Sequence, residues 1–310
     1  MAKPVSITIA ICTWNRCQLL QRALEHLLPQ TCPAGFSWDV VVVNNNCTDA
    51  TSQVVRSFAD RLRIREVLEP KPGLSNARNR ALAEATADYI AWTDDDVLVD
   101  PDWIAQLCAG IEAYPDAAGF GGTIEPLFPE EPDPVLLAAF PVLATGFCGL
   151  SHGTQVRELP EGEQVFGANM AYSMSAARGI AFDPKLGVVE GVTLAGEEEA
   201  YQNELRRRGG RIFWLPAMRV RHFVEASRMT LDYLLRYAYD RGRTLMRMHK
   251  GLNEPKILGA PRWAWMLMMR AYLRYLRYRV TWNREAALSS LREFHNMRGM
   301  VAEGFSRLRA

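Results

Sequence analysis

The sequence predicts an α/β fold: a mainly parallel sheet with helices on both faces, followed by a helical C-terminal region. Two observations lead to this prediction. In the first 125 residues, short apolar and β-branched runs alternate with segments whose apolar residues have helical spacing. This alternation is typical of parallel strands joined by crossover helices. Beyond Thr230 the spacing is helical nearly to the end of the sequence.

The expected strands are short apolar runs, because a parallel sheet buries its strands on both faces. They cover residues 5–12, 40–43, 62–68, 89–93 and 118–124. The helices expected between them cover residues 18–28, a segment with Val54, Val55 and Phe58 capped by Thr48 or Asp49, and residues 74–85. Asp100 and Pro101 predict a further helix, with Asp100 as its N-cap and Pro101 at its first position.

Polar clusters follow three of these expected strands. Thr13, Asn15 and Arg16 follow the first strand, asparagines 44–46 follow the second, and aspartates 94–96 follow the fourth. In open parallel sheets, ligands bind beyond the carboxyl ends of the strands, where the strand order reverses. The sequence therefore predicts a binding site at one edge of the sheet.

The three consecutive aspartates predict a metal site at that edge. Side chains two residues apart in an extended chain point the same way, so Asp94 and Asp96 can converge on one point. Two converging carboxylates repel each other unless a cation or a proton compensates them. Carboxylate oxygens suit Mg²⁺ or Mn²⁺. The alternative is a solvated acidic turn, which the position after a buried strand disfavours.

Four motifs, in order, resemble those of glycosyltransferase family 2. They are IAICTWNR at 9–16, VVVNNNCTDAT at 41–51, GLSNARN at 73–79, and the aspartate segment at 89–103. The resemblance covers roughly residues 5–225. It implies the GT-A fold and an inverting enzyme that transfers a sugar from a nucleotide diphosphate sugar to an acceptor hydroxyl. The expected setting is cell-surface polysaccharide or glycolipid synthesis.

The resemblance also implies a donor site. Thr13 and Asn45 would line the base pocket, Arg78 would lie near the donor phosphates, and Asp94 would lie near the ribose or the metal's water shell. The donor would be UDP-, GDP- or dTDP-linked; Asn44 and Asn45 stand where many relatives have Asp, which leaves the base open. The full set of expected donor-binding residues is Thr13, Asn15, Arg16, Asn45, Arg78, Asp94, Asp95 and Asn169.

A run of three glutamates is expected to supply the catalytic base. The residues GEEE at 196–199 resemble the family's G-E-D-x-D-L motif, and Gly209 stands at the family's usual 13-residue spacing. This register makes Glu198 the base, with Glu197 as its competitor. Acidic residues are also favourable at a helix N-terminus, which is the alternative explanation of the run.

The metal is expected to be Mn²⁺ or Mg²⁺. By resemblance Asp96 would be a ligand, with Asp94 beside it. His222 would be a third ligand or a phosphate contact, since some GT-A enzymes use a histidine in this region. The alternative for His222 is a histidine satisfied by the neighbouring backbone.

The C-terminal third is strongly basic. Residues 206–310 carry 23 Lys and Arg against seven Asp and Glu, whereas residues 1–205 carry 13 against 28. Residues 262–282 interleave arginines with aromatic and aliphatic residues, which is typical of a helix lying at an anionic membrane surface. The alternative is a packed helix with solvated arginines. Because no recognition motif accompanies the charge, we do not expect nucleic-acid binding.

The expected organisation is a GT-A domain at 1–225 and a basic helical region at 226–310. Within the first, 1–125 would bind the nucleotide sugar and 126–225 the acceptor, which would be a glycan or lipid-linked. Residues 126–165 are rich in Pro and Gly and predict an irregular connection. The six cysteines include no C-x-x-C pair, and no apolar run reaches the length of a bilayer span. We therefore expect a reduced cytoplasmic protein, peripheral on the inner face of the membrane.

Two other functions remain open from the sequence. A sugar nucleotidyltransferase also has an α/β fold and an acidic metal site, but it usually has a Gly-rich loop after the first strand, and residues 13–17 contain no glycine. A non-catalytic nucleotide-sugar-binding membrane adaptor would bind a donor without turning it over. The presence of Asp94, Asp96, Glu197 and Glu198 disfavours a decayed site of that kind.

Overall fold

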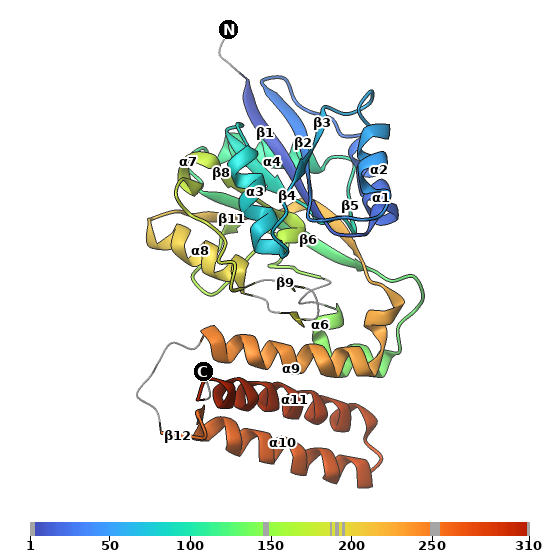
Figure 1. Cartoon of the computed structure of the whole chain (residues 1–310), viewed down its shortest axis with the longest axis vertical. Coiled ribbons are helices and arrows are strands. Elements are labelled where there is room, and N and C mark those ends of the chain that lie inside the picture. Colours follow the sequence, from blue (N-terminus) through green and yellow to red (C-terminus); the bar gives the residue numbers. More distant parts are fainter. Residues whose placement is uncertain are drawn as a thin grey trace. The chain divides into compact units, whose positions relative to one another are not determined.

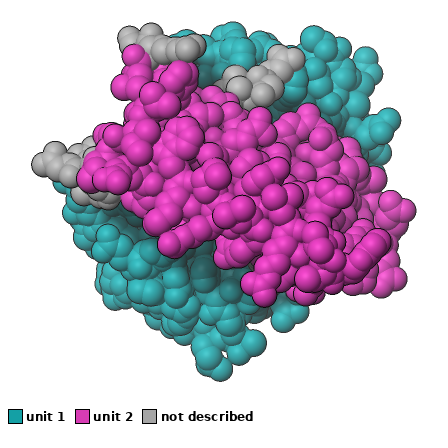
Figure 2. Space-filling view, turned by 90° about the horizontal axis from the view of Figure 1, so that it is seen from below, with its two compact units in different colours: residues 1–127, 148–187, 197–223 teal, residues 128–147, 188–196, 224–310 magenta. Residues whose placement is uncertain are grey.

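The computed structural model describes residues 4–144, 149–186, 188–189, 192–193, 196–248 and 255–308 (Figure 1). The chain divides into two compact units, which Figure 2 distinguishes by colour. Unit 1 comprises residues 1–127, 148–187 and 197–223, and unit 2 comprises residues 128–147, 188–196 and 224–310. Two segments inside the first 225 residues thus group with the C-terminal helices.

Unit 1 is built on one mixed sheet, and the predicted α/β fold is confirmed. The strand order is β3-β2-β1-β4-β8-β6-β11-β5, with β7 also paired to β11. Strands β3, β2, β1 and β4 are mutually parallel, as are β6 and β11, whereas β8, β5 and β7 are antiparallel to their neighbours. The bounds are β1 (Val5–Thr13), β2 (Phe36–Asn44), β3 (Ile64–Leu68), β4 (Tyr89–Trp92), β5 (Val97–Val99), β6 (Gly119–Leu127), β7 (Arg157–Glu158), β8 (Met170–Ser173) and β11 (Ile212–Phe223).

Helices cover both faces of this sheet. They are α1 (Cys17–Leu27), α2 (Thr51–Ser57), α3 (Leu74–Glu84), α4 (Trp103–Ala113), α7 (Met174–Ala177) and α8 (Glu197–Arg207), with a 3₁₀ turn η1 (Gly167–Asn169). Alternate residues of β2 enter two separate cores: Val40 and Val42 pack with α1, α2 and α4, while Val41 and Val43 pack with α3 and α8. Burial on both faces explains why these strands are continuous apolar runs.

The start of α4 differs from the prediction. The helix begins at Trp103, and residues 101–102 form a turn in which the Trp103 N–H donates to the Asp100 carbonyl at 3.0 Å. Asp102, rather than Asp100, is therefore the N-cap residue. The Trp103 side chain is fully buried, so we attribute the later start to the burial of this ring in the core.

Three strands that the sequence did not predict complete the sheet beside the aspartates. They are β5, β8 and β11. The three-residue strand β5 follows the aspartates directly and pairs antiparallel with β11, so that Val97 lies opposite His222. The Phe223 N–H also donates to the Asp96 carbonyl at 2.9 Å. The Val97–His222 pair joins residues 125 positions apart in sequence and places His222 next to the aspartates.

Unit 2 is mainly helical, as predicted beyond Thr230. Its elements are α5 (Pro134–Ala139), α6 (Pro141–Ala144), β9 (Val188–Val189), β10 (Val192–Thr193), η2 (Ala226–Met229), α9 (Leu231–Met248), β12 (Lys256–Ile257), β13 (Ala260–Pro261), α10 (Arg262–Val280) and α11 (Arg284–Ser306). Two short helices thus lie in the segment predicted to be irregular. No described helix has both the length and the apolarity that a membrane crossing requires.

Helix α11 lies between α9 and α10 in this unit (Figure 1). Glycines let α9 and α11 approach closely. A Cβ atom on Gly242 would lie 1.8 Å from the Asn296 carbonyl oxygen, and one on Gly299 would lie 1.9 Å from that of Tyr239. At this crossing only a residue without a side chain fits.

Candidate functional site

The carboxyl ends of β1, β2 and β4 meet at one edge of the sheet, as the sequence predicts. Thr13 ends β1 directly opposite Asn44, and β1 pairs on its other side with β4. The Thr13 hydroxyl donates to the Asp95 carboxylate at 2.7 Å. The polar clusters that follow these strands therefore form one site.

Asp94, Asp96 and His222 form a group that could hold a metal ion. One ligand atom of each lies within 4.8 Å of the others. The His222 ring lies with Nε2 3.5 Å from an Asp96 oxygen, and its Nδ1 is 3.1 Å from the Phe223 carbonyl oxygen. A carbonyl can only accept, so Nδ1 donates there, and Nε2 is the ring nitrogen that faces Asp96. Two carboxylates and an imidazole oriented in this way suit a divalent cation.

The charge balance of the aspartates also favours a cation. Burial and the neighbouring Asp96 carboxylate raise the pKa of Asp95 to about 7, although the Arg16 guanidinium opposes this shift. Burial likewise raises the pKa of Asp94. Arg16 Nη1 lies 2.9 Å from Asp96 and 3.3 Å from Asp95. The Arg16 guanidinium thus pairs with two of the three crowded carboxylates, and a divalent cation would compensate their charge further.

Arg78 joins the two candidate bases. Its Nη1 donates to Glu197 at 2.8 Å, and its Nη2 donates to Glu198 at 2.7 Å. The Gly167 N–H donates to the same Glu198 oxygen, Oε1, at 2.8 Å. Among the described residues, both of these hydrogen bonds are accepted by the same oxygen of Glu198, Oε1. Burial raises the pKa of Glu198, with Arg78 opposing the shift and Glu197 adding to it.

The two glutamates differ in exposure. The Glu197 side chain is 6% exposed and that of Glu198 is 20% exposed, while Arg78 is buried at 2%. Only Glu198 is thus partly open to an incoming molecule. The sequence placed Arg78 near the donor phosphates; in the structure its guanidinium is directed to the glutamates and lies 5.4 Å from the Phe182 ring centroid.

Gly167 leaves room for this ion pair. A Cβ atom there would lie 1.9 Å from Arg78 Nη2 and 2.4 Å from Glu198 Oε1. We expect Gly167→Ala to displace Glu198 and to lower the turnover number by about 100-fold, the cost of misplacing a catalytic group by about 1 Å. Steady-state kinetics would measure this, with the affinity for Mn²⁺ unchanged.

The matched control for Gly167→Ala is Gly110→Ala. Its added methyl group would meet the Leu215 side chain at 2.5 Å, in the core and away from the glutamates. This variant crowds the protein without touching the site. A Gly167→Ala enzyme as active as the Gly110→Ala enzyme would show that Gly167 does not position Glu198.

Asn45 and Asn15 order the loops of the site. The Asn45 amide donates to the carbonyls of Glu69 and Lys71 at 2.8 and 2.7 Å and accepts from the Gly73 N–H at 2.9 Å. Asn15 accepts from the Thr48 N–H at 2.7 Å and has a positive φ of 53°, which Asn adopts at lower cost than most residues. Both amides are directed to neighbouring loops.

Asn169 lies within the fold. It is fully buried; its Oδ1 accepts from the Trp103 indole at 2.8 Å, and its Nδ2 donates to the carbonyls of Met218 and Thr123 at 2.7 and 3.0 Å. Three hydrogen bonds connect α4, β6 and β11 through this one side chain. Asn169 therefore supports the sheet next to the site through hydrogen bonds within the fold.

Trp14 is a residue of this edge that the sequence reasoning did not single out. It follows Thr13, and its side chain is a large apolar group that is 47% exposed. An aromatic face at a nucleotide site can stack on a base. The signal that could have identified it is an aromatic residue inside the polar cluster that follows the first strand.

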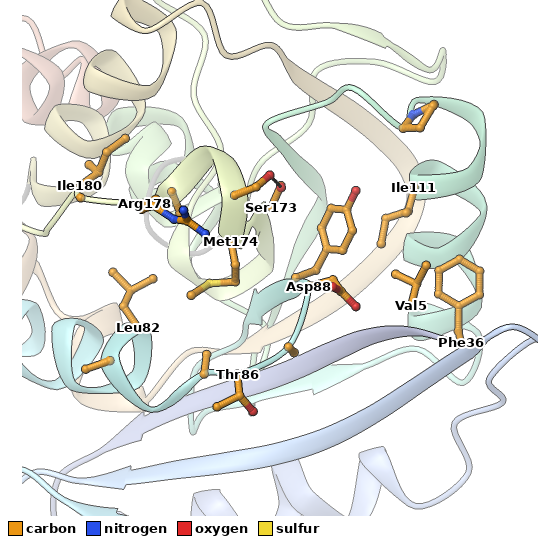
Figure 3. A pocket seen from close by; sticks show the side chains of 18 of the residues that line it. Val5, Phe36, Leu82, Thr86, Asp88, Ile111, Ser173, Met174, Arg178 and Ile180 are labelled. Carbon is orange, nitrogen blue, oxygen red and sulfur yellow. Dashed lines mark hydrogen bonds between the residues drawn. The ribbon is translucent and has the colours of Figure 1, made fainter. Parts of the chain in front are cut away.

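A large pocket lies at the opposite edge of the sheet (Figure 3). Its volume is about 1040 Å³. Val5 and Phe36 at the starts of β1 and β2 line it, together with Asp88 and Met174. Because Thr13 and Asn44 end these same strands, this pocket is separate from the aspartate site.

Known proteins resemble this chain in sequence and in structure. Residues 8–128 match the family model for glycosyl transferase family 2. Validoxylamine A glucosyltransferase of Streptomyces hygroscopicus subsp. jinggangensis is 38% identical over 105 residues, which are 33% of this chain and 25% of that protein. Glucosyl-dolichyl phosphate glucuronosyltransferase of Haloferax volcanii is 28% identical over 141 residues, 41% of this chain and 43% of that protein. The chain thus matches less than half the length of these relatives.

Two solved structures share the architecture over nearly the whole chain. S. aureus TarS 1-349 in complex with UDP has a TM-score of 0.56 at 14% identity and covers 95% of this chain and 91% of its own. The mannosyltransferase PcManGT from Pyrobaculum calidifontis, in complex with GDP-Man and Mn²⁺, has a TM-score of 0.55 at 17% identity. The match covers 96% of this chain and 74% of that one. At these identities the likeness shows the fold.

The fold of this chain is the one that these two structures share, and its candidate site lies at the carboxyl ends of the parallel strands. Residues 8–128, which are less than half of the chain, carry the similarity to glycosyl transferase family 2. Thr13, Arg78 and the aspartates lie inside the matched region. Glu198 and His222 lie outside it, and the tertiary structure brings them to the same site.

Proposed function

We propose that the protein transfers a sugar from a nucleotide diphosphate sugar to an acceptor hydroxyl, with inversion at the anomeric carbon. The proposal rests on one observation above all: the candidate metal group and the glutamate pair are neighbours. Trp92, which stands just before the aspartates, pairs with Met170 of β8, and the Gly167 N–H just before that strand donates to Glu198. A group that can hold a metal at the leaving diphosphate therefore lies near a carboxylate that can accept a proton.

Asp94, Asp96 and His222 would hold the metal. When bound, a divalent cation would neutralise charge as the diphosphate leaves. The imidazole favours Mn²⁺ over Mg²⁺, because Mg²⁺ prefers oxygen ligands in a regular octahedron. Arg16, beside Asp95 and Asp96, would supply a further positive charge to this side of the donor.

Glu198 would act as the general base. Its Oε1 is held by Arg78 and the Gly167 N–H, so the carboxylate has a defined orientation. The raised pKa brings Glu198 closer to neutral pH, where a carboxylate is a more effective base. Glu197 is more deeply buried and shares Arg78 with Glu198. We assign Glu197 and Arg78 to positioning the base.

Thr13, Asn15 and Asn45 belong to the proposed nucleotide pocket, with Trp14 as an added contact. Trp14 would stack on the base through its exposed ring. Asn45 would act by holding residues 69–73 in place. The proposed donors are UDP-, GDP- or dTDP-linked sugars. Two of the structural neighbours were solved with UDP and with GDP-Man, which supports a donor of this class.

The acceptor would be a glycan or a lipid-linked glycan of the cell surface. Several relatives carry names of this kind, including a chondroitin synthase and a succinoglycan biosynthesis protein. The contact of residues 262–282 with an anionic membrane, predicted from the sequence, is a proposal that would bring the enzyme to such acceptors.

A panel of UDP-, GDP- and dTDP-linked sugars tests the proposed function. We expect one donor to release its nucleotide diphosphate slowly in the presence of Mn²⁺, and EDTA to abolish the release. Donor binding would be measured by calorimetry in parallel. Binding without turnover, even with a broad acceptor mixture, would favour the non-catalytic adaptor. Turnover of a sugar phosphate with a nucleoside triphosphate would favour a nucleotidyltransferase.

A further inference from the structure

Helix α10 presents apolar side chains to solvent along its whole length. Met266, Met269, Leu273, Leu276 and Val280 are between 40% and 79% exposed. Their spacing of three, four, three and four residues places them on one face of the helix. We call these five residues the outer stripe. A continuous exposed stripe of this kind marks an interaction surface.

The outer stripe is not the face that packs in the helical unit. The more buried positions of α10 are 263, 264, 265, 268, 271, 275 and 278. Ala264 packs there in a cluster with Val301 of α11. Residues 266, 273 and 280 of the outer stripe each come two residues after a more buried position, namely 264, 271 and 278. Two residues correspond to a rotation of about 200° at 3.6 residues per turn. The stripe thus points directly away from α11.

The charge beside the stripe has a single sign. Residues 262–282 contain five arginines and neither Asp nor Glu. Arg270 and Arg277 are exposed and lie on the flank of the stripe. Arg274 is paired with Glu293 of α11. Trp282 follows the helix and is 93% exposed; amphipathic aromatic rings of this kind favour the boundary between lipid and water.

We propose that α10 docks this enzyme on an anionic lipid surface, with the outer stripe inserted among the lipids. The stripe would enter the acyl boundary while Arg270 and Arg277 reach the phosphate groups. A second copy of the chain fits the surface less well. Contact between two α10 helices would bring two arginine-rich, acid-free flanks together, and like charges across an interface are unfavourable.

Flotation of the whole protein with vesicles tests this proposal. One set is phosphatidylcholine alone, and the other is phosphatidylcholine and phosphatidylglycerol in equal parts. We expect binding to the anionic set alone, weakened by added salt. The Arg270→Gln/Arg277→Gln variant should bind about 30-fold more weakly, at about fivefold per arginine. Leu273→Gln should weaken binding by about tenfold, since it removes an inserted side chain.

The matched control is Leu68→Gln. Leu68 is 64% exposed, close to the 60% of Leu273, but lies on β3, so its replacement should leave vesicle binding unchanged. Circular dichroism would confirm that each variant is folded. Equal loss in Leu68→Gln and Leu273→Gln would overturn the proposal, as would binding to both vesicle sets alike. Concentration-dependent self-association lost in Leu273→Gln, without vesicle binding, would instead assign the stripe to contacts between copies. These readouts are independent of sugar transfer, so they hold whatever the outcome of the donor panel.

Discussion

Replacement of Glu198 with Gln is expected to lower the turnover number for sugar transfer by about 100-fold to about 10,000-fold, the usual contribution of a general base. Gln keeps the shape and still accepts hydrogen bonds from Arg78 and Gly167 through its carbonyl oxygen, but it cannot take a proton. The affinity for the donor and for Mn²⁺ should change little. Steady-state kinetics with the donor from the panel would measure the loss.

The pH profile adds a second readout for Glu198. Because its folded pKa is raised, the fraction of ionised base increases with pH through a range above the ordinary value of 4.5 for Glu. The kcat/KM of the native enzyme should therefore rise with pH across that range. The residual activity of Glu198→Gln should lack this rise.

The neighbouring Glu197→Gln variant is the matched control. It makes the same chemical change one residue away, at a side chain that contacts the same arginine. We expect its turnover number to fall by about tenfold or less, because the charged hydrogen bond between Arg78 and residue 197 would become a weaker, neutral one. If Glu197→Gln lost the pH-dependent rise and Glu198→Gln kept it, Glu197 would be the base.

Replacement of Asp96 with Asn is expected to reduce the affinity for Mn²⁺ by at least about 100-fold, since outer-shell changes alone commonly cost 10- to 100-fold. Asp96 is one of three groups in the candidate metal site, and the amide removes the charge that holds a divalent cation. Electron paramagnetic resonance would measure free and bound Mn²⁺ directly. The rate of donor hydrolysis should fall in proportion to the fraction of enzyme with Mn²⁺ bound.

Asp95→Asn is the control for the metal site. Asp95 is equally buried, but it accepts from Thr13 and Arg16 and is not part of the Asp94, Asp96 and His222 group. Its replacement should change Mn²⁺ affinity by less than about tenfold. Equal losses in both variants would show that the cation is held by the net charge of the cluster rather than by Asp96 itself.

Local sequence patterns were sufficient for strands β1 to β4 and for the helices between them. The strands 5–12 and 40–43 are continuous β-branched runs because both of their faces are buried, and this constraint is visible in the sequence without knowledge of the partners. The motifs after these strands identified the edge where Thr13 and Asp95 meet. The predicted start of α4 at Pro101 was wrong, and we attribute the start at Trp103 to the burial of its ring.

Several roles depended on contacts that no local pattern records. Asn169 is one of the donor-binding residues expected by resemblance, but its amide bonds with Trp103, Met218 and Thr123. Arg78 is directed to Glu197 and Glu198, which lie some 120 positions away. The hydrogen-bonding capacity of a polar side chain is set by whatever surrounds it in the folded state.

The sequence by itself determined the class of fold, the edge of the sheet where the polar clusters meet, and the residue types gathered there. Those properties follow from periodicity and from side-chain chemistry, which are local. The tertiary structure alone decided how the His222 ring is oriented beside Asp96, that Glu198 is more open than Glu197, and that α10 turns one apolar face outward. Each of these depends on strand register or helix packing between distant segments, because pairing at long range places side chains that the chain order keeps apart.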